Sequence, residues 1–334
     1  MTRERVVLAL QQEYAARREE NLRAYEEKVN DACARCQGLR GLLDARHSAL
    51  MSGLRSALYP AKKDVAANEG LASTLETYNA KINEKLAACG LPPDTLAPQF
   101  VCSRCKDEGY VYDPTRRMCP CFESELNARM LLALGLKGTQ TFETFQEGIF
   151  SDEPMLGKLS QKVLMKQNKA ICERYADAFP DTDARDLLFT GKSGLGKTFL
   201  MQAIAHRVTL RGHEVTYISA YKLLETMRKA YFANNSEWME PLMETPLLLV
   251  DDLGTEPLME NITVTQLFNL LNERQNANRH TIISTNLNLS ELRARYTERI
   301  TSRLLDASRV RVLKFIGEDI REKRGKPDQG GNDA

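Results

Sequence analysis

The sequence predicts an α/β fold, in which helices cover a five-stranded parallel sheet, preceded by an α-helical N-terminal domain and a small cysteine-rich module. Two observations support this. From about residue 171 onward, short apolar runs alternate with helical segments, which is typical of a parallel sheet covered on both faces. Before them, prolines, glycines and cysteines crowd into residues 89–122. A length of 334 residues leaves room for two or three domains.

Residues 1–90 are expected to form a coiled-coil-like helical domain. Apolar or small side chains recur at alternating steps of three and four, at Leu22, Tyr25, Val29, Ala32, Cys36, Leu39 and Leu43. Pro60 interrupts the pattern, and a second helical stretch runs from about Lys62 to Ala88. Two helices separated by a proline predict an antiparallel hairpin, which either packs on itself or also offers a docking surface to a partner.

Residues 91–125 are expected to form a zinc-binding module. They contain two close cysteine pairs thirteen residues apart, Cys102 with Cys105 and Cys119 with Cys121. Such spacing suits a structural Zn²⁺ held by four thiolates, with free thiols or a redox pair as the alternatives. The tyrosines of "GYVYD" predict a short β-hairpin between the pairs. A further C-x-x-C, Cys33 and Cys36, lies in the helical pattern and is expected to be core.

The remaining segments are assigned from their local pattern. Residues 126–170 are expected to be a linker, with a helix in "ESELNARMLLALGLKG" followed by the aromatic "TFETF". Residues 171–318 carry the sheet, with strands expected at 187–190, 215–219, 247–251, 281–285 and 310–315. Residues 319–334 are polar and rich in glycine, and are expected to be a disordered tail.

Charge, apolar runs and cysteine content together indicate where in the cell the protein is expected to be. A net charge of +1 gives no global sign of a nucleic-acid or membrane partner. The start, "MTRERVVLALQQEY", has an apolar run too short for a signal peptide, and no run approaches the roughly 18 apolar residues that span a bilayer. Without an export signal, the eight cysteines are expected to be mostly reduced. We therefore expect a cytoplasmic protein with no membrane partner.

A complete phosphate-binding loop follows the first strand of the sheet. The pattern G-x-x-x-x-G-K-[ST] is matched by Gly191, Lys192, Ser193, Gly194, Leu195, Gly196, Lys197 and Thr198. Glycines let successive N–H groups point inward at a phosphate, and the helix that follows presents its positive end to the same anion. Lys197 is expected to reach the β/γ-phosphates and the Thr198 hydroxyl to ligate Mg²⁺.

Polar residues that follow later strands complete the expected site. The apolar strand in "LLLVDDLG" ends in two acids, of which Asp251 is placed to hold Mg²⁺ and Asp252 to orient or deprotonate water. Asn286 emerges from "TIISTN", where its amide is expected to bind the γ-phosphate or the attacking water. Arg299 and Arg303 lie four residues apart on one helix face. Such a face is either solvated surface or the source of an arginine finger for a neighbouring copy.

In this order and spacing, "GKSGLGKT", "LLLVDDLGTE", "TIISTNL" and "ERITSRLLD" resemble the AAA+ ATPase module of bacterial replicative helicase loaders of the DnaC/DnaI type. Transposition helper ATPases of the IstB type share the module. The resemblance covers roughly residues 140–318 and includes the aromatic "TFETF". It implies an AAA+ P-loop fold in which Asp251 is the magnesium-associated acid, Asp252 the catalytic carboxylate and Asn286 the sensor residue. It also implies an arginine finger, assigned to Arg303 with Arg299 second.

The resemblance further implies a function and partners. The protein is expected to be an ATPase, weak alone and stimulated by DNA or assembly, that loads a replicative ring helicase onto single-stranded DNA during initiation or restart. Its ATPase domains are expected to self-associate, and residues 1–90 to bind the helicase. The basic and aromatic residues Lys222, Arg228, Lys229, Tyr231 and Phe232 are expected either to contact DNA or to belong to an ordinary amphipathic helix.

Three other functions stay open from the sequence. The first is an IstB-like transposition helper, which a cysteine-rich module ahead of the ATPase disfavours. The second is a small-molecule P-loop kinase, which has little use for a zinc module or an arginine pair. The third is a nucleotide-gated adaptor that binds ATP and barely hydrolyses it. The expected cofactors of the main interpretation are ATP, Mg²⁺ and a structural Zn²⁺.

Overall fold

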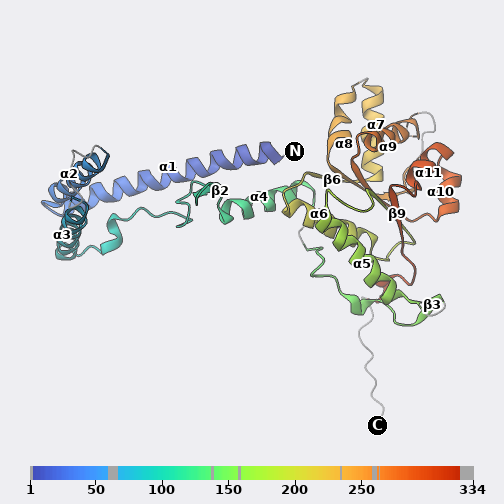
Figure 1. Cartoon of the computed structure of the whole chain (residues 1–334), viewed down its shortest axis with the longest axis horizontal. Coiled ribbons are helices and arrows are strands. Elements are labelled where there is room, and N and C mark those ends of the chain that lie inside the picture. The colour runs from blue at the N-terminus through green and yellow to red at the C-terminus, as the bar shows by residue number, and fades with distance from the viewer. Residues whose placement is uncertain are drawn as a thin grey trace, which may run out of the picture. The chain divides into compact units, whose positions relative to one another are not determined.

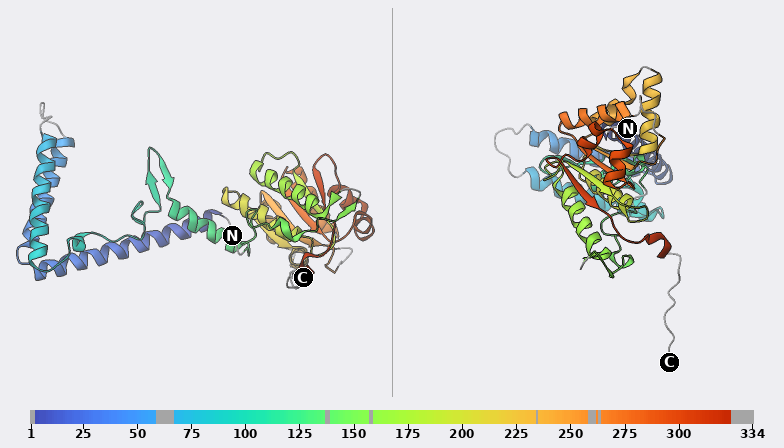
Figure 2. Two further views of the ribbon diagram at one scale, coloured as in Figure 1. Left: turned by 90° about the horizontal axis from the view of Figure 1, so that it is seen from below. Right: turned by 90° about the vertical axis from the view of Figure 1, so that its right-hand side faces the viewer.

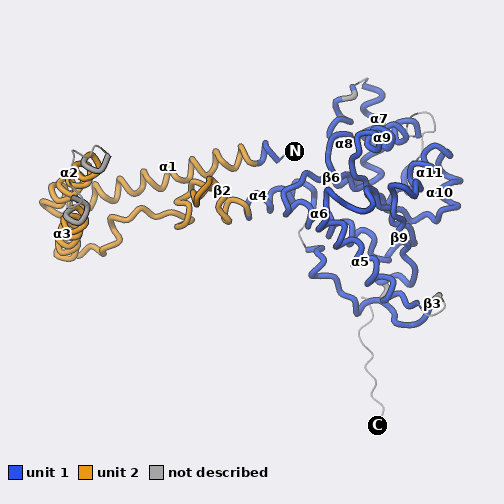
Figure 3. Tube along the Cα trace, viewed as in Figure 1, with its two compact units in different colours: residues 1–6, 124–334 blue, residues 7–123 orange. Residues whose placement is uncertain are grey.

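The structure, a computed structural model, describes residues 3–58, 67–136, 139–156, 159–233, 235–257, 262 and 264–323. The chain divides into two compact units, residues 7–123 and residues 1–6 with 124–334 (Figure 3). The first unit therefore joins the helical region to the cysteine-rich module, and the second joins the expected linker to the sheet. Across the described ranges, every helix is too short or too polar to cross a bilayer.

Three helices begin the chain: α1 (Arg3–Arg35), α2 (Leu39–Leu58) and α3 (Ala67–Ala88) (Figure 1). The antiparallel hairpin consists of α2 and α3. Arg46 of α2 donates a hydrogen bond to Asn79 of α3 at 3.1 Å. Toward the end of α2 and the start of α3, Gly53 lies directly against Leu71. Pro60, which we expected to divide the helices, lies outside the described residues.

The expectation that one helix continues through Leu43 is wrong. α1 ends at Arg35 and α2 begins at Leu39, with Gly38 at a φ of +86° between them. Cys36 and Leu39 are fully buried at this corner, where they pack against residues of α3. The apolar spacing continues from α1 into α2 because Cys36 and Leu39, at the corner between the two helices, are also core residues. Cys36 is joined to Cys89 by a disulfide.

The cysteine-rich segment folds against α1 within the same unit. It contains the short helix η1 (Pro93–Leu96) and an antiparallel hairpin of β1 (Tyr110–Tyr112) and β2 (Arg116–Met118), followed by α4 (Pro120–Ala133). The hairpin stands out clearly in the left view of Figure 2. The ring of Tyr14 on α1 contacts that of Phe122 at 5.0 Å, and Gln11 donates a hydrogen bond to the Tyr110 hydroxyl. The hairpin predicted from "GYVYD" is confirmed.

The second unit is built on a parallel sheet of five strands, in the order β6-β7-β8-β5-β9. The strands are β5 (Asp186–Thr190), β6 (Val215–Ser219), β7 (Leu247–Leu253), β8 (His280–Thr285) and β9 (Val310–Lys314). The elements before them are η2 (Glu147–Ile149), β3 (Pro154–Leu156), β4 (Leu159–Ser160) and α5 (Gln161–Ala178). Those between and after them are α6 (Lys197–Leu210), α7 (Ala220–Phe232), η3 (Ser236–Trp238), α8 (Glu240–Glu244), α9 (Thr265–Asn276), α10 (Leu289–Arg295), α11 (Glu298–Leu304) and α12 (Ile320–Lys323). The expected α/β class and its five-stranded parallel sheet are confirmed.

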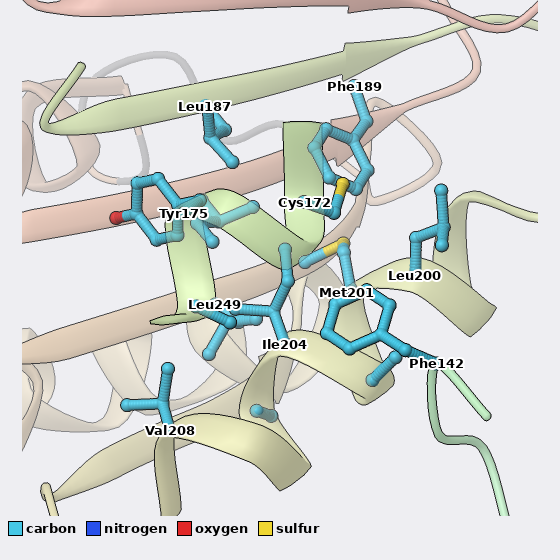
Figure 4. Packing of buried hydrophobic residues seen from close by; sticks show 14 of the residues in the cluster. Phe142, Cys172, Tyr175, Leu187, Phe189, Leu200, Met201, Ile204, Val208 and Leu249 are labelled. Carbon is cyan, nitrogen blue, oxygen red and sulfur yellow. The ribbon is translucent and has the colours of Figure 1, made fainter. Parts of the chain in front are cut away.

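Alternate side chains of the strands enter two cores, one on each face of the sheet. Leu187 and Phe189 of β5 pack with α5 and α6, as Figure 4 shows, whereas Leu188 packs on the opposite face with α7, α9, α10 and α11. Phe142, from the aromatic "TFETF", is buried in the first core. The aromatic segment therefore packs as part of the second unit. α12 begins the stretch that we expected to be a disordered tail, and residues 324–334 lie outside the described residues.

Candidate functional site

The phosphate loop connects β5 to α6, as its motif requires. Gly191, Gly194 and Gly196 all adopt positive φ values, of 147°, 77° and 89°. At Gly191 an added Cβ would lie 2.1 Å from the backbone oxygen of Phe315. Only glycine fits both this conformation and this contact, so the loop is fixed against the segment that follows β9.

Lys197 lies in the first turn of α6 and folds back over the loop. Its Nζ donates hydrogen bonds to the backbone oxygens of Gly191 at 2.5 Å and Lys192 at 2.7 Å. Burial lowers the pKa of Lys197, a shift that Asp252 and Asp251 oppose. The ammonium group is thus held at the centre of a loop whose backbone N–H groups favour an anion.

Asp251 is buried at the end of β7 and accepts three hydrogen bonds from hydroxyl groups. Thr198 donates to its Oδ1 at 3.3 Å and Ser284 to the same oxygen at 2.5 Å. Tyr217 donates to Oδ2 at 2.6 Å. Burial and the carboxylate of Asp251 raise the pKa of Tyr217, which therefore stays a donor. These contacts fix the carboxylate beside the threonine of the phosphate loop.

Asp252 has a φ of +60°, an uncommon conformation for a residue other than glycine. Its backbone N–H donates to Ser284 Oγ at 2.8 Å, so Ser284 contacts both acids of the pair. Partial burial and Asp251 raise the pKa of Asp252, whereas Lys197 and Arg321 oppose the shift. The turn directs Asp252 to the same cavity as the phosphate loop.

That cavity has a volume of about 210 Å³. Its polar lining comes from Ser193 to Thr198, Asp252 and Arg321. Its apolar lining comes from the segment before α5, from α6 and from α12, through Phe145, Ile149, Phe150, Phe199 and Ile320. Phe145 and Phe150 stack with their ring centroids 5.5 Å apart. The arrangement offers charged groups to phosphates beside an aromatic wall that suits a base.

Asn286 and the two arginines lie elsewhere. Asn286 follows β8 and lines a neighbouring cavity together with Gly191 and Lys192 of the loop. Arg303 is half-buried on α11, where its guanidinium donates to Asn272 Oδ1 of α9 at 2.8 Å. Arg299, on the same helix, is exposed. Neither arginine lines the cavity of the phosphate loop.

The four expected zinc ligands come together in the other unit. The sulfur atoms of Cys102, Cys105, Cys119 and Cys121 all lie within 4.8 Å of one another. Cys102 and Cys119 are 3.9 Å apart, and Cys105 and Cys121 are 3.6 Å apart. A Zn–S bond of about 2.3 Å in a tetrahedron puts the sulfurs about 3.8 Å apart, so the cluster fits Zn²⁺.

Asp107 organises the first half of this cluster and was not predicted from the sequence. It is fully buried, and its carboxylate accepts the backbone N–H groups of Val101 at 3.0 Å and Cys102 at 2.9 Å. It also accepts Asn21 Nδ2 of α1 at 2.9 Å. Asp107 and Lys106 both have positive φ values, as a tight knuckle between paired ligands requires. Arg116 on β2 lies over the ring of Tyr110 at 4.0 Å.

The basic and aromatic segment of α7 forms an amphipathic helix. Leu223, Leu224 and Met227 are buried, whereas Tyr231 and Phe232 are 53% and 67% exposed. Lys222 and Lys229 both pair with Glu225 on the same helix, at 2.9 and 2.7 Å. Packing of the buried face explains the apolar spacing of this helix. It does not explain why the two aromatic side chains, Tyr231 and Phe232, are exposed.

Several residues of the candidate site were not predicted. Tyr217 and Ser284 both donate to Asp251 from the strands on either side of β7, and their position on these strands was the available signal. Arg321 had no local signal, because α12 is brought to the loop only by the fold: Ile320 N donates to Gly194 O at 3.0 Å.

Residues 167–326 match the family model described as IstB-like ATP binding protein. The chain is 27% identical over 136 residues to the replicative helicase loader DnaC of Escherichia coli (strain K12), covering 39% of this chain and 54% of that protein. It is 26% identical over 150 residues to DnaC of Buchnera aphidicola subsp. Acyrthosiphon pisum (strain APS), covering 43% and 58%. A solved structure of the DnaC helicase loader aligns with a TM-score of 0.44 and 20% identity, over 53% of this chain and 97% of that one.

The chain spans about half the length of the curated relatives that it matches. The matched region contains the phosphate loop, both acids, Asn286 and the arginine-bearing helix α11. Both the family model and the named relatives agree with the resemblance found in the sequence motifs. Residues 167–326 therefore carry the match to the IstB/DnaC family of ATP-binding proteins, and they do so on a P-loop attached to a five-stranded parallel sheet.

Proposed function

We propose that this protein is an ATP-dependent loader that places a replicative ring helicase on single-stranded DNA in the cytoplasm, during initiation or restart of replication. The observation that carries the proposal is the contact network in which Thr198 and Ser284 both bind Asp251 while Asp252 faces the same cavity. Such a network suits hydrolysis of ATP, and the named relatives of this domain are helicase loaders.

Each residue has a role in this proposal. Thr198 and Asp251 offer hard oxygen donors that fit Mg²⁺, which neutralises phosphate charge when bound. Lys197 binds the β/γ-phosphates, and Asp252 orients the attacking water and accepts its proton. Asn286 contacts the γ-phosphate or the water. Arg321 lines the cavity from α12 and adds a positive charge from the same chain.

The ATPase is proposed to be weak alone and stimulated by assembly or DNA, because a neighbouring copy supplies an arginine finger. The sequence favoured Arg303 over Arg299. The hydrogen bond from Arg303 to Asn272 engages Arg303 within its own domain, whereas Arg299 is exposed. We therefore reverse the order and propose Arg299 first.

The exposed surfaces suit two macromolecular partners. Tyr231 and Phe232 are proposed to stack on bases of single-stranded DNA, with Arg228 nearby on the same helix. Residues 1–90 are proposed to bind the helicase, and α2 leaves Leu50, Met51 and Leu54 exposed at 38%, 41% and 46%. The thiol cluster is proposed to hold a structural Zn²⁺ that keeps the hairpin folded against α1.

The decisive experiment mixes the full chain with the replicative helicase of the same organism, with and without ATP. We expect the wild type to form a complex with the helicase and to transfer the helicase to circular single-stranded DNA. Asp252→Asn is expected to bind the helicase and to fail in its release. A protein that never binds the helicase would contradict the proposal.

A transposition helper of the IstB type is the second candidate, and it is favoured by the description of the matching family model. The two candidates differ in the partner of the assembled ATPase. Stable binding to a transposase from a neighbouring mobile element, together with no binding to the replicative helicase, would favour this second function.

A further inference from the structure

A buried carboxylate outside the expected site lies in the turn that follows the two catalytic acids. Glu256 is 1% exposed, and its side chain is completely inaccessible. A carboxylate is rarely buried unless donors compensate it. Glu256 Oε2 accepts the backbone N–H of Gly254 at 2.7 Å, and its other oxygen accepts the hydroxyl of Tyr296.

Arg295 completes this cluster from the end of α10. Its guanidinium lies 3.9 Å from the Glu256 carboxylate and donates a hydrogen bond to the backbone oxygen of Glu256. Tyr296, which follows Arg295, is 3% exposed and sits between α10 and α11. Both the side chain and the backbone of Glu256 are therefore attached to the junction of these two helices.

The turn between Asp252 and Glu256 is constrained at each step. Asp252 has a φ of +60°, and its backbone N–H donates a hydrogen bond to Ser284 Oγ. Its backbone oxygen accepts a hydrogen bond from the Thr255 hydroxyl at 3.0 Å. Gly254 has a φ of +109°, and an added Cβ there would lie 2.7 Å from Leu287. A residue in the left-handed region persists only when its surroundings hold it. The bond from Gly254 to Glu256 closes this turn.

We propose that Glu256 is a positioning residue for ATP hydrolysis: clasped by Gly254, Arg295 and Tyr296, it sets the conformation of the turn that carries Asp252 and ties that turn to the junction of α10 and α11. The inference rests on the proposed function, since it concerns the residue proposed to activate water. It also goes further, because α11 carries Arg299. A displacement of α11 on assembly is then transmitted to Asp252 through Tyr296 and Glu256.

The test is the steady-state ATPase activity of the Tyr296→Phe variant, with Tyr175→Phe as the matched control. Both tyrosines are buried and both donate hydrogen bonds, but Tyr175 donates to the Arg185 backbone before β5, away from the cavity. We expect Tyr296→Phe to lower kcat about tenfold while the affinity for nucleotide changes less than about twofold. We expect Tyr175→Phe to lower the melting temperature and to leave kcat unchanged.

A second measurement separates positioning from a general loss of stability. If Glu256 acts through Asp252, Tyr296→Phe has no further effect on the residual rate of Asp252→Asn, so the two losses are not additive. Glu256→Gln, which keeps an acceptor for the Gly254 N–H, serves in place of Tyr296→Phe should that variant not fold, and is expected to lower kcat in the same way.

The outcomes distinguish this inference from the proposed function. A wild type that hydrolyses ATP, with unchanged kcat in both Tyr296→Phe and Glu256→Gln, would overturn the positioning role alone. Losses that simply add to that of Asp252→Asn would also overturn it. A wild type with no ATPase activity, even when assembled on DNA, would overturn the proposed function and this role with it.

Discussion

Thr198 and Asp251 are 53 residues apart in the chain and are joined by a hydrogen bond of 3.3 Å from the threonine hydroxyl to the carboxylate. Thr198 lies in the first turn of α6, and Asp251 lies near the carboxyl end of β7. The sheet order puts β8 between their strands, so the contact depends on the sheet as a whole. The two proposed magnesium ligands are thus placed together by the fold before any ion binds.

Tyr217→Phe is predicted to raise the concentration of Mg²⁺ needed for half-maximal ATPase activity. Its hydroxyl fixes Asp251 Oδ2, and outer partners of metal ligands change metal affinity by about tenfold or more when removed. The measurement is a magnesium titration of the ATPase rate at fixed ATP. Tyr221→Phe, which alters an exposed tyrosine on α7, is the control. Identical titrations for the wild type and Tyr217→Phe would contradict the role given to Tyr217.

His280 is predicted to make the ATPase unit less stable in mild acid. Burial, reinforced by nearby Arg185, lowers the pKa of His280 to about 4, from about 6.5 in the unfolded chain. Between these values the unfolded state binds more protons, so the stability present above pH 6.5 is progressively lost as the pH falls.

The full effect of this lowered pKa on stability is of the order of 3 kcal/mol. The measurement is urea denaturation at pH 7.5 and pH 5. His280→Asn is expected to be less stable at pH 7.5 and to lose less on acidification than the wild type. His206 and His213, whose pKa values burial also lowers, keep part of the pH dependence. An equal loss in both proteins would contradict the prediction.

The thiol cluster is predicted to bind one Zn²⁺ per chain. Removing the metal with a strong chelator is expected to unfold the β1–β2 hairpin, because the hairpin has only three residues in each strand and little core of its own. Metal analysis and hydrogen exchange of residues 101–122 check this. Cys105→Ser is expected to lose zinc, whereas Cys172→Ser, which alters a buried cysteine of the other unit, is expected to keep it. Equal zinc content in both variants would contradict the assignment.

Substitutions of Arg299 and Arg303 are predicted to have different effects on ATPase activity and on stability. Arg299→Ala is expected to lose the stimulation of ATPase activity on assembly and to keep the melting temperature, because its side chain is exposed. Arg303→Ala is expected to lower the melting temperature by removing the bond to Asn272. Rates at increasing protein concentration and thermal unfolding check both. Full stimulation of the ATPase activity in Arg299→Ala would contradict this assignment and favour Arg303 as the arginine finger.

The phosphate loop and the strands were predictable because their signals are contiguous in the sequence. Gly191 to Thr198 form a single motif, and each strand of the sheet is a contiguous segment of five to seven residues that contains apolar side chains. The corner at Cys36 was missed because its apolar spacing continues across Gly38, and spacing does not distinguish a straight helix from two helices that share a core.

Contacts made by the tertiary fold carried no such signal. Arg321 reaches the phosphate loop from α12, and Glu256 reaches Tyr296 across 40 residues. The inward bond of Arg303 was likewise invisible, since its partner Asn272 lies on a different helix. In each case the side chain can be read from the sequence, but its contact partner is determined by the packing of elements that are distant in the chain.

We propose above that Lys197 binds ATP and that Asp252 drives its hydrolysis. Both roles are tested by nucleotide binding and turnover in the wild type, Lys197→Ala and Asp252→Asn. Calorimetry with Mg²⁺ and ATP is predicted to give one site per chain in the wild type and in Asp252→Asn, and none in Lys197→Ala. The wild type is predicted to release phosphate, and Asp252→Asn to release it at a rate about 100-fold or more lower. Equal binding by Lys197→Ala, or undiminished hydrolysis by Asp252→Asn, would contradict these roles of the two residues.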